Sequence, residues 1–138
     1  MGLTRSGFLL ALALSAGCSF TQTNPAPVVD VAVRRSEISN GESALQLGLR
    51  QYDEGQYKRA TSTFLQSLEA GLSPAKQIIA HKHLAFIYCT SNKVSLCRHE
   101  FNKVIEVDPR FELAPAEAGH PQWGPVFRSV KSRQPTSS

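Results

Sequence analysis

The stretch of residues 80–109, AHKHLAFIYCTSNKVSLCRHEFNKVIEVDP, decides how the rest of the chain is organised. Its first half carries four apolar side chains among polar neighbours: Leu84, Phe86, Ile87 and Tyr88. In its second half, apolar residues recur at intervals of three and four, which is one face of a helix; these are Val94, Cys97, Phe101, Val104 and Ile105. The pattern predicts two helices with a tight turn at 90–92. Asp108-Pro109 ends the second helix, because proline cannot continue it.

The preceding residues, 42–71, repeat this arrangement. Asn40 or Ser39 can cap a helix that begins near Glu42. Gly55, in the turn that follows, is free to adopt a left-handed conformation, and a second helix is expected over 57–70. Landmark residues of the two stretches lie 37 positions apart: Gly48 and Ala85, Ala60 and Cys97, and Phe64 and Phe101. This constant offset indicates an internal repeat.

The repeated pattern resembles the tetratricopeptide repeat, in which small and large residues alternate across an antiparallel helix pair. The matching residues are Leu47-Gly48, Gly55, Tyr57, Ala60 and Phe64 in the first stretch, and Leu84-Ala85, Tyr88, Cys97, Phe101, Val104 and Pro109 in the second. The family's period is about 34 residues, and the extra residues here fall near 71–75, where Ser73-Pro74 can begin a helix early. The resemblance implies an all-α fold of two helix hairpins, with repeat 1 over about 42–71 and repeat 2 over about 74–109.

The resemblance also implies a protein-binding groove along the first helix of each hairpin. Carried over position by position, the groove residues are Leu45, Leu49, Tyr52, Ile79, Lys82 and Phe86. For the apolar members, packing against the carboxyl-terminal segment is the alternative. Chaperone-binding members of the family clamp a terminal carboxylate with several lysine and asparagine residues. Only Lys82 stands in a matching place, so that version of the function is not expected.

The amino terminus has the parts of a secretory signal. Arg5 precedes a short apolar run, FLLALAL at 8–14, which is too short to span a bilayer, and small residues follow at 15–17. The sequence LSAGC, which ends at Cys18, resembles a bacterial lipobox. The resemblance implies a signal peptide over 1–17 and acylation of Cys18. Because Ser19 follows instead of aspartate, it also implies sorting to the outer membrane, facing the periplasm. An ordinary secreted protein with a coincidental cysteine is the alternative.

Residues 19–40 contain a Pro-Ala-Pro sequence and show no helical period. Such a segment buries too little apolar surface to offset the entropy of ordering it. We therefore expect residues 18–40 to be an acylated terminus followed by a disordered tether that lets the folded part stand off the membrane. A brief strand at 28–33 would need a partner strand that the sequence does not offer.

Two further cysteines, Cys89 and Cys97, stand on either side of the turn at 90–92. Antiparallel helices around a short turn bring such positions together, and the compartment that the lipobox implies is oxidising. We expect a Cys89–Cys97 disulfide. The alternatives are two buried thiols that pack as small apolar groups, or zinc bound together with His81, His83 or His99, although the spacing fits no standard site. A thiol-redox catalyst is not expected, because the sequence has no C-x-x-C.

The segment after the second repeat, residues 110–131, cannot form a third one, since Pro115, Gly119 and Pro121 interrupt it. Residues 123–131 can form a short helix that begins at the second proline. Two repeats leave an open hydrophobic end, and arrays of this kind usually carry a cap. We expect the segment to close that end with Phe111, Leu113, Trp123 and Phe127; an exposed aromatic docking site for a partner is the alternative. Residues 132–138 are expected to be a disordered tail.

The sequence offers no catalytic constellation. The chain lacks a Ser-His-Asp order, a glycine-rich phosphate loop and metal-ligand spacing, and its four histidines are scattered. We expect neither an enzyme nor a cofactor, a metal or a small-molecule substrate. The formal net charge is +4, without a basic block, which argues against nucleic-acid binding.

Lipobox, two repeats and the ending PAEAGHPQWGPVF at 115–127 together resemble the small tetratricopeptide-repeat lipoproteins associated with type VI secretion loci of Gram-negative bacteria. The resemblance implies a membrane-anchored adaptor whose partner is an envelope or secretion-system protein. A pilotin or outer-membrane assembly scaffold is the alternative, and a periplasmic chaperone or inhibitor is a third possibility from another class. The predicted layout is a signal peptide at 1–17, a tether at 18–40, a repeat domain at 41–131 and a tail at 132–138.

Overall fold

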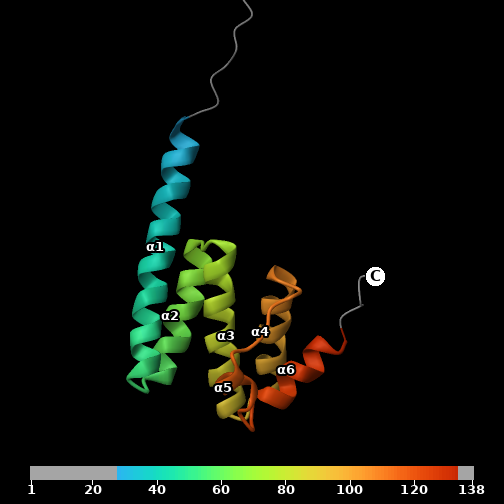
Figure 1. Cartoon of the computed structure of the whole chain (residues 1–138). Coiled ribbons are helices and arrows are strands. Elements are labelled where there is room, and N and C mark those ends of the chain that lie inside the picture. Colours follow the sequence, from blue (N-terminus) through green and yellow to red (C-terminus); the bar gives the residue numbers. More distant parts are fainter. Residues whose placement is uncertain (1–27, 134–138) are drawn as a thin grey trace, which may run out of the picture.

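A computed structural model describes residues 28–133, which fold into six α-helices (Figure 1). Their bounds are α1 Val28–Asp53, α2 Tyr57–Ala70, α3 Pro74–Thr90, α4 Val94–Val107, α5 Pro115–Ala118 and α6 Gly124–Lys131. Every regular element in this range is helical, so the predicted all-α class is confirmed. The predicted signal peptide, the lipidation site Cys18, the first part of the tether and most of the tail lie outside the described residues.

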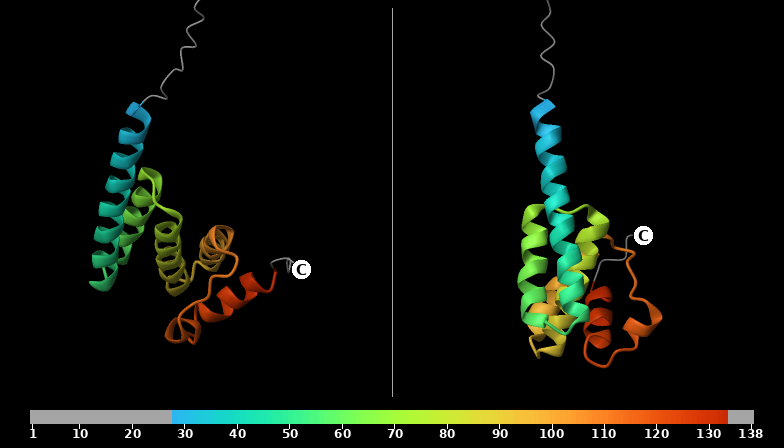
Figure 2. Two further views of the ribbon diagram at one scale, coloured as in Figure 1. Left: turned by 45° about the horizontal axis from the view of Figure 1, so that its top comes forward. Right: turned by 90° about the vertical axis from the view of Figure 1, so that its left-hand side faces the viewer.

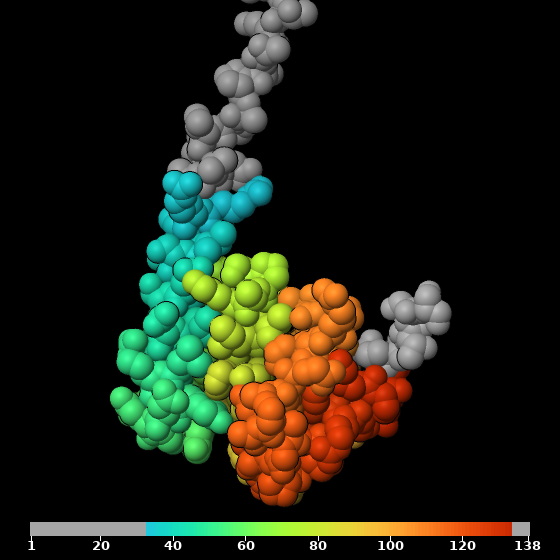
Figure 3. All heavy atoms as spheres, viewed as in Figure 1, coloured from blue at the N-terminus to red at the C-terminus, as the bar shows by residue number. Residues whose placement is uncertain are grey.

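The helices follow one another in space in the order of the sequence. α1 and α2 lie side by side and run in opposite directions, and α3 and α4 do the same (Figure 1, Figure 2). α2 also packs on α3, which joins the two helix pairs, and α6 lies against α4 at the far end. The result is a short stack of helices with the carboxyl-terminal segment at one end, as the space-filling view in Figure 3 shows.

The 37-residue offset of the sequence is also an offset of the backbone. α2 and α4 each have 14 residues and begin at Tyr57 and Val94, 37 positions apart. The turns before them match as well, because the Gln56 amide donates to the Gln51 carbonyl at 2.7 Å and the Lys93 amide donates to the Tyr88 carbonyl at 2.8 Å. Gly55 and Asn92, again 37 apart, both have a positive φ, of 72° and 59°. The left-handed conformation expected of Gly55 is thus confirmed, and the internal repeat is structural.

Two apolar clusters form the core, and each includes residues of α3. The first joins α1, α2 and α3 around the fully buried Phe64; its buried members are Leu45, Ala60, Phe64, Leu72, Ala80, Leu84 and Ile87. The second joins α3, α4 and the carboxyl-terminal segment around Phe101; its buried members are Ala85, Phe86, Cys89, Cys97, Phe101, Ile105, Leu113, Phe127 and Val130. Burial of this apolar surface is the main force that holds the helices together.

Two glycines of α1 permit its close approach to α2. A Cβ at Gly48 would lie 2.7 Å from the ring of Phe64, which is fully buried and has no room to move. A Cβ at Gly41 would overlap the carbonyl oxygen of Gly71, at the end of α2. Small residues are therefore required at both places, although glycine inside a helix lowers its intrinsic stability by about 1 kcal/mol.

The predicted start of the first helix was wrong. We expected a tether up to residue 40 and a helix from Glu42, or a brief strand at 28–33, but α1 begins at Val28. No glycine or proline occurs between Val28 and Gly41, so the helix can extend from its packed half, and each added residue contributes one more backbone hydrogen bond. Residues 33–40 are all exposed. They form a projecting arm with no buried face and therefore leave no helical period for sequence analysis to detect (Figure 2).

The carboxyl-terminal segment folds back on the second helix pair, as predicted. Leu113 and Phe127 are buried in the second core cluster, and Phe111 and Trp123 pack against it. The predicted short helix is present as α6, and α5 adds a single turn before it, which the sequence analysis did not foresee. Of the helices in residues 28–133, none combines the length and the apolar character needed to cross a membrane.

Candidate functional site

The six residues predicted to line a groove do not form an open surface. Leu45 and Phe86 are each only 3% exposed and belong to the core. Leu49, Tyr52 and Ile79 are half-buried and pack against the first core cluster. This prediction was wrong for Leu45 and Phe86, because the sequence pattern of a helix does not distinguish a side chain that lines a groove from one that packs in the core.

The carboxyl-terminal segment covers the half of the predicted groove that α3 contributes. The indole of Trp123 stacks on the ring of Phe86, with centroids 4.3 Å apart and 21° between the planes. Lys82 pairs with the carboxylate of Glu117, in α5, at 2.5 Å. The Trp123 ring nitrogen donates to the Glu117 carbonyl at 2.8 Å, which fixes α5 and the indole to each other. The alternative of a freely exposed aromatic docking site is therefore wrong for Phe111, Phe127 and Trp123.

His83, on α3, is surrounded by aromatic side chains of the predicted groove and of the core. Its ring contacts three aromatic rings: Tyr52 at 5.0 Å, Phe64 at 5.6 Å and Phe86 at 6.0 Å between centroids. Its Nδ1 donates to the carbonyl of Ile79 at 2.7 Å. Burial lowers the pKa of His83 below its ordinary value of 6.5, because the charged form would lose its hydration there. The side chain therefore acts as a neutral packing residue at neutral pH.

Cys89 and Cys97 form the disulfide that the sequence analysis predicted, with Cα atoms 5.2 Å apart. The bond joins the last turn of α3 to the first turn of α4 and lies in the second core cluster. Both thiols are thereby used, so the zinc alternative lacks its sulfur ligands. One of its histidines, His81, instead contacts the carboxylate of Glu100 on α4 at 2.7 Å, where it adds a polar link between α3 and α4.

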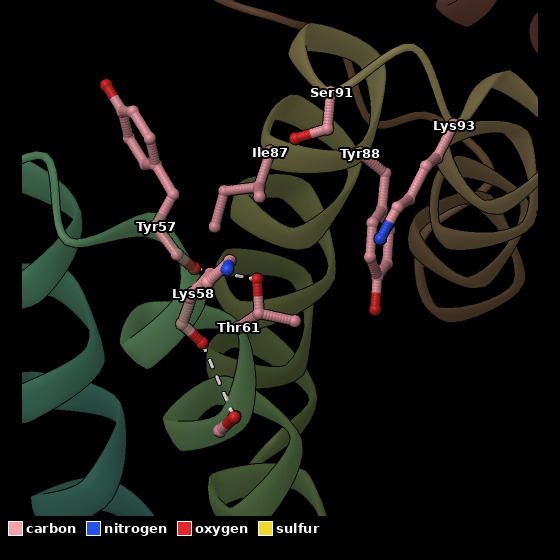
Figure 4. A pocket seen from close by; sticks show the side chains of 8 residues that line it. Tyr57, Lys58, Thr61, Ile87, Tyr88, Ser91 and Lys93 are labelled. Carbon is pink, nitrogen blue, oxygen red and sulfur yellow. Dashed lines mark hydrogen bonds between the residues drawn. The ribbon is translucent and has the colours of Figure 1, made fainter.

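A pocket that sequence analysis missed lies where the beginning of α2 meets the α3–α4 turn (Figure 4). Its volume is about 500 Å³, and its lining residues are Tyr57, Lys58, Thr61, Ser62, Ile87, Tyr88, Ser91 and Lys93. Ile87 is only 4% exposed and forms the apolar floor, whereas Tyr57 is 49% exposed. Lys58, Thr61 and Ser62 share one side of α2, since they lie three and four residues apart. This spacing within α2 can be read from the sequence. The opposite wall of the pocket belongs to α3 and the α3–α4 turn, so the sequence pattern alone does not reveal the pocket.

The polar groups of this pocket are either cationic or neutral. Thr61 and Ser62 donate their hydroxyl hydrogens to the carbonyls of Tyr57 and Lys58, at 2.8 and 3.4 Å, and keep their oxygen lone pairs (dashed lines in Figure 4). The Lys93 ammonium lies 6.0 Å from the centre of the Tyr88 ring. Burial raises the pKa of Tyr88, and the nearby Glu100 adds to the effect, so the phenol remains a hydrogen-bond donor. Of the described residues, none that lines the pocket carries a carboxylate.

The two lysines of the pocket differ from the other four in the chain. Lys76, Lys82, Lys103 and Lys131 each pair with a glutamate of the described chain, at 2.5 to 2.8 Å. Lys58 and Lys93 pair with no carboxylate among the described residues. The lysines that lack an acidic partner are thus the two that line one pocket.

A second cavity, also of about 500 Å³, lies between the carboxyl-terminal helices. Arg128 and Lys131 line it, but both are engaged within the segment. Arg128 donates to the carbonyl of Ala118 at 3.2 Å, and Lys131 pairs with Glu112 at 2.7 Å. Its positive groups therefore hold the segment in place.

Comparison of the chain with protein-family models, with curated proteins and with solved structures found no match.

Proposed function

We propose that this chain is a lipid-anchored tetratricopeptide-repeat adaptor that binds a protein of the bacterial envelope, as an accessory of a type VI secretion system. The observation that carries the proposal is the 37-residue repeat of the backbone, in which two helix pairs share the same turn geometry and stack on each other. Stacked helix pairs of this kind present extended surfaces to partner proteins. The assignment to type VI secretion rests on the resemblance of the sequence ending at 115–127.

Two further features suit an adaptor held at a membrane. The exposed arm of residues 33–40 separates the packed domain from the amino terminus, where the lipobox-like sequence ends at Cys18. α1 as a whole is about 39 Å long at 1.5 Å per residue. The disulfide joins α3 to α4, and the folded-back segment packs on the second helix pair, which suits a small two-repeat domain.

Affinity isolation from crosslinked envelopes tests the proposal. The tagged full chain would be produced in its native host, crosslinked in the intact cell and purified from the solubilised membrane fraction. We expect to recover an envelope-spanning component of the secretion machine with the wild-type chain, and much less with Cys18→Ala. Recovery of an outer-membrane assembly component in its place would support the scaffold alternative. Recovery of no envelope or secretion-system protein would contradict the proposal.

A further inference from the structure

We propose that the pocket between α2 and the α3–α4 turn is the docking site for an acidic segment of the protein partner. This inference deepens the proposed function and rests on it for the claim that the partner is a protein. The pocket has an apolar floor, hydroxyl groups on one wall and two ammonium groups, from Lys58 and Lys93. Such a surface suits a segment that carries an apolar side chain next to carboxylates.

The charge argument comes from the contrast among the six lysines. Four of them already have a glutamate as a partner, so an external anion would have to displace it. Within residues 28–133, Lys58 and Lys93 have no competing carboxylate. Glu100 acts on Tyr88 of the pocket lining, and its carboxylate is engaged by His81 at 2.7 Å. An incoming carboxylate therefore meets two available ammonium groups and no fixed negative charge in the lining.

The position of the pocket favours a protein over lipid headgroups. The pocket lies at the end of the domain where α1 stops, by the turns that precede α2 and α4. The other end of α1, which leads to the amino terminus, points away from it (Figure 1). Because α1 is about 39 Å long, the end of α1 from which the chain leads to Cys18 lies far from the pocket.

A second copy of this chain is a poor occupant. Acidic residues are dispersed along the sequence, and the only two adjacent ones are Asp53 and Glu54. Glu54 is engaged as well, since it accepts a hydrogen bond from Gln56 at 2.7 Å. Glu106 and Asp108 flank Val107, but Glu106 pairs with Lys103 at 2.8 Å and Asp108 accepts a hydrogen bond from the Arg110 amide at 2.9 Å. The chain thus offers no unengaged acidic stretch of its own for this pocket.

The experiment is a selection from a phage-displayed library of random peptides on the purified full chain, followed by affinity measurement with the selected peptides. The test variant is Lys58→Gln/Lys93→Gln. The control variant, Arg110→Gln/Arg133→Gln, removes the same charge from exposed positions outside the pocket. Circular dichroism and thermal unfolding of both variants establish that they remain folded. Binding of the same variants to vesicles of phosphatidylglycerol and phosphatidylethanolamine is measured in a separate experiment.

We expect acidic peptides to be enriched and to bind about tenfold more weakly to the lysine variant, with little change for the arginine variant. Equal weakening in both variants would overturn the pocket, because it would indicate attraction by net charge alone. If the selected peptides bind the wild-type chain and Lys58→Gln/Lys93→Gln equally well, the pocket is not the docking site, although the proposed adaptor function would still hold. Enrichment of no peptide would overturn the pocket as a peptide-docking site, whereas the adaptor function is tested separately by crosslinking in envelopes. Lysine-dependent binding of vesicles without binding of acidic peptides would overturn the protein partner in favour of a lipid.

Discussion

The ring of Trp123 stacks on the ring of Phe86, at 4.3 Å between centroids, and this contact holds the carboxyl-terminal segment against α3. The two residues are 37 positions apart in the sequence and come from different elements. Phe86 is a position at which the resemblance to the tetratricopeptide repeat implies a partner-binding groove. The chain thus covers part of its own predicted groove.

Replacement of the indole should loosen the segment. We expect Trp123→Ala to lower the free energy of unfolding by about 2–3 kcal/mol, because it removes a large aromatic contact and exposes Phe86. Leu96→Ala is the control, since Leu96 is 45% exposed and its truncation should change stability by less than about 0.5 kcal/mol. Urea unfolding followed by far-ultraviolet circular dichroism measures both. Equal effects of the two substitutions would show that the stacking is unimportant.

The disulfide should stabilise the second helix pair. Closure of the short loop between Cys89 and Cys97 reduces the entropy of the unfolded chain, which corresponds to about 2–3 kcal/mol. We expect dithiothreitol to lower the urea midpoint of the wild-type chain and to leave that of Cys89→Ala/Cys97→Ala unchanged. A wild-type midpoint that does not respond to the reductant would argue against the bond.

The packing of α1 on α2 predicts a specific intolerance at Gly48. An added methyl group would lie 2.7 Å from the ring of Phe64, so we expect Gly48→Ala to destabilise the protein by about 1–3 kcal/mol through overpacking, despite the better helix propensity of alanine. A Cβ at Gly119 would lie 3.7 Å from its nearest neighbour, the carbonyl oxygen of Pro115, so Gly119→Ala serves as the control. Thermal unfolding measures the stability of Gly48→Ala and Gly119→Ala relative to the wild type. A stabilised Gly48→Ala would mean that α1 and α2 are farther apart than the 2.7 Å contact implies.

Stability should fall at mildly acidic pH because of His83. Burial lowers the pKa of His83 in the folded state, so the unfolded chain binds more protons at this site once the pH falls to about 6.5. The contribution of His83 is therefore fully present above that pH and is lost as the pH falls toward the folded-state pKa. We expect His83→Phe, which keeps the aromatic contacts, to lose less stability than the wild type between pH 7.5 and about 5.5. Parallel stability curves would exclude this role.

Membrane attachment depends, on our proposal, on Cys18. We expect labelled palmitate to be incorporated into the wild-type chain and into Cys89→Ala/Cys97→Ala, but not into Cys18→Ala. Only Cys18→Ala should leave the membrane fraction, because several buried acyl chains hold a protein firmly there. Continued sedimentation of Cys18→Ala with membranes, without palmitate label, would instead indicate a different anchor.

The parts of the fold that sequence analysis predicted well are those with local or periodic signals. Pro74 at the start of α3 and Gly55 before α2 act within their own turns, and the buried faces of α2 and α4 recur every three or four residues. The arm at 33–40 gave no such signal because all its side chains are exposed. Packing of Phe86 against the carboxyl-terminal segment was the alternative that the sequence analysis gave. The contact of Lys82 with Glu117, 35 positions later, has no local sequence signal and was not predicted. The pocket was missed because its walls come from two hairpins.

Site-specific photocrosslinking in the native host tests most directly which surface of the proposed adaptor binds its partner. Benzoylphenylalanine would replace Tyr57, which lines the pocket between α2 and the α3–α4 turn, or Ile79, one of the residues predicted to line the groove. We predict a crosslinked envelope protein from position 57, and its loss when Lys58→Gln/Lys93→Gln is added. Crosslinks from position 79 and none from position 57 would contradict the account, since the partner would then bind the face that the carboxyl-terminal segment partly covers.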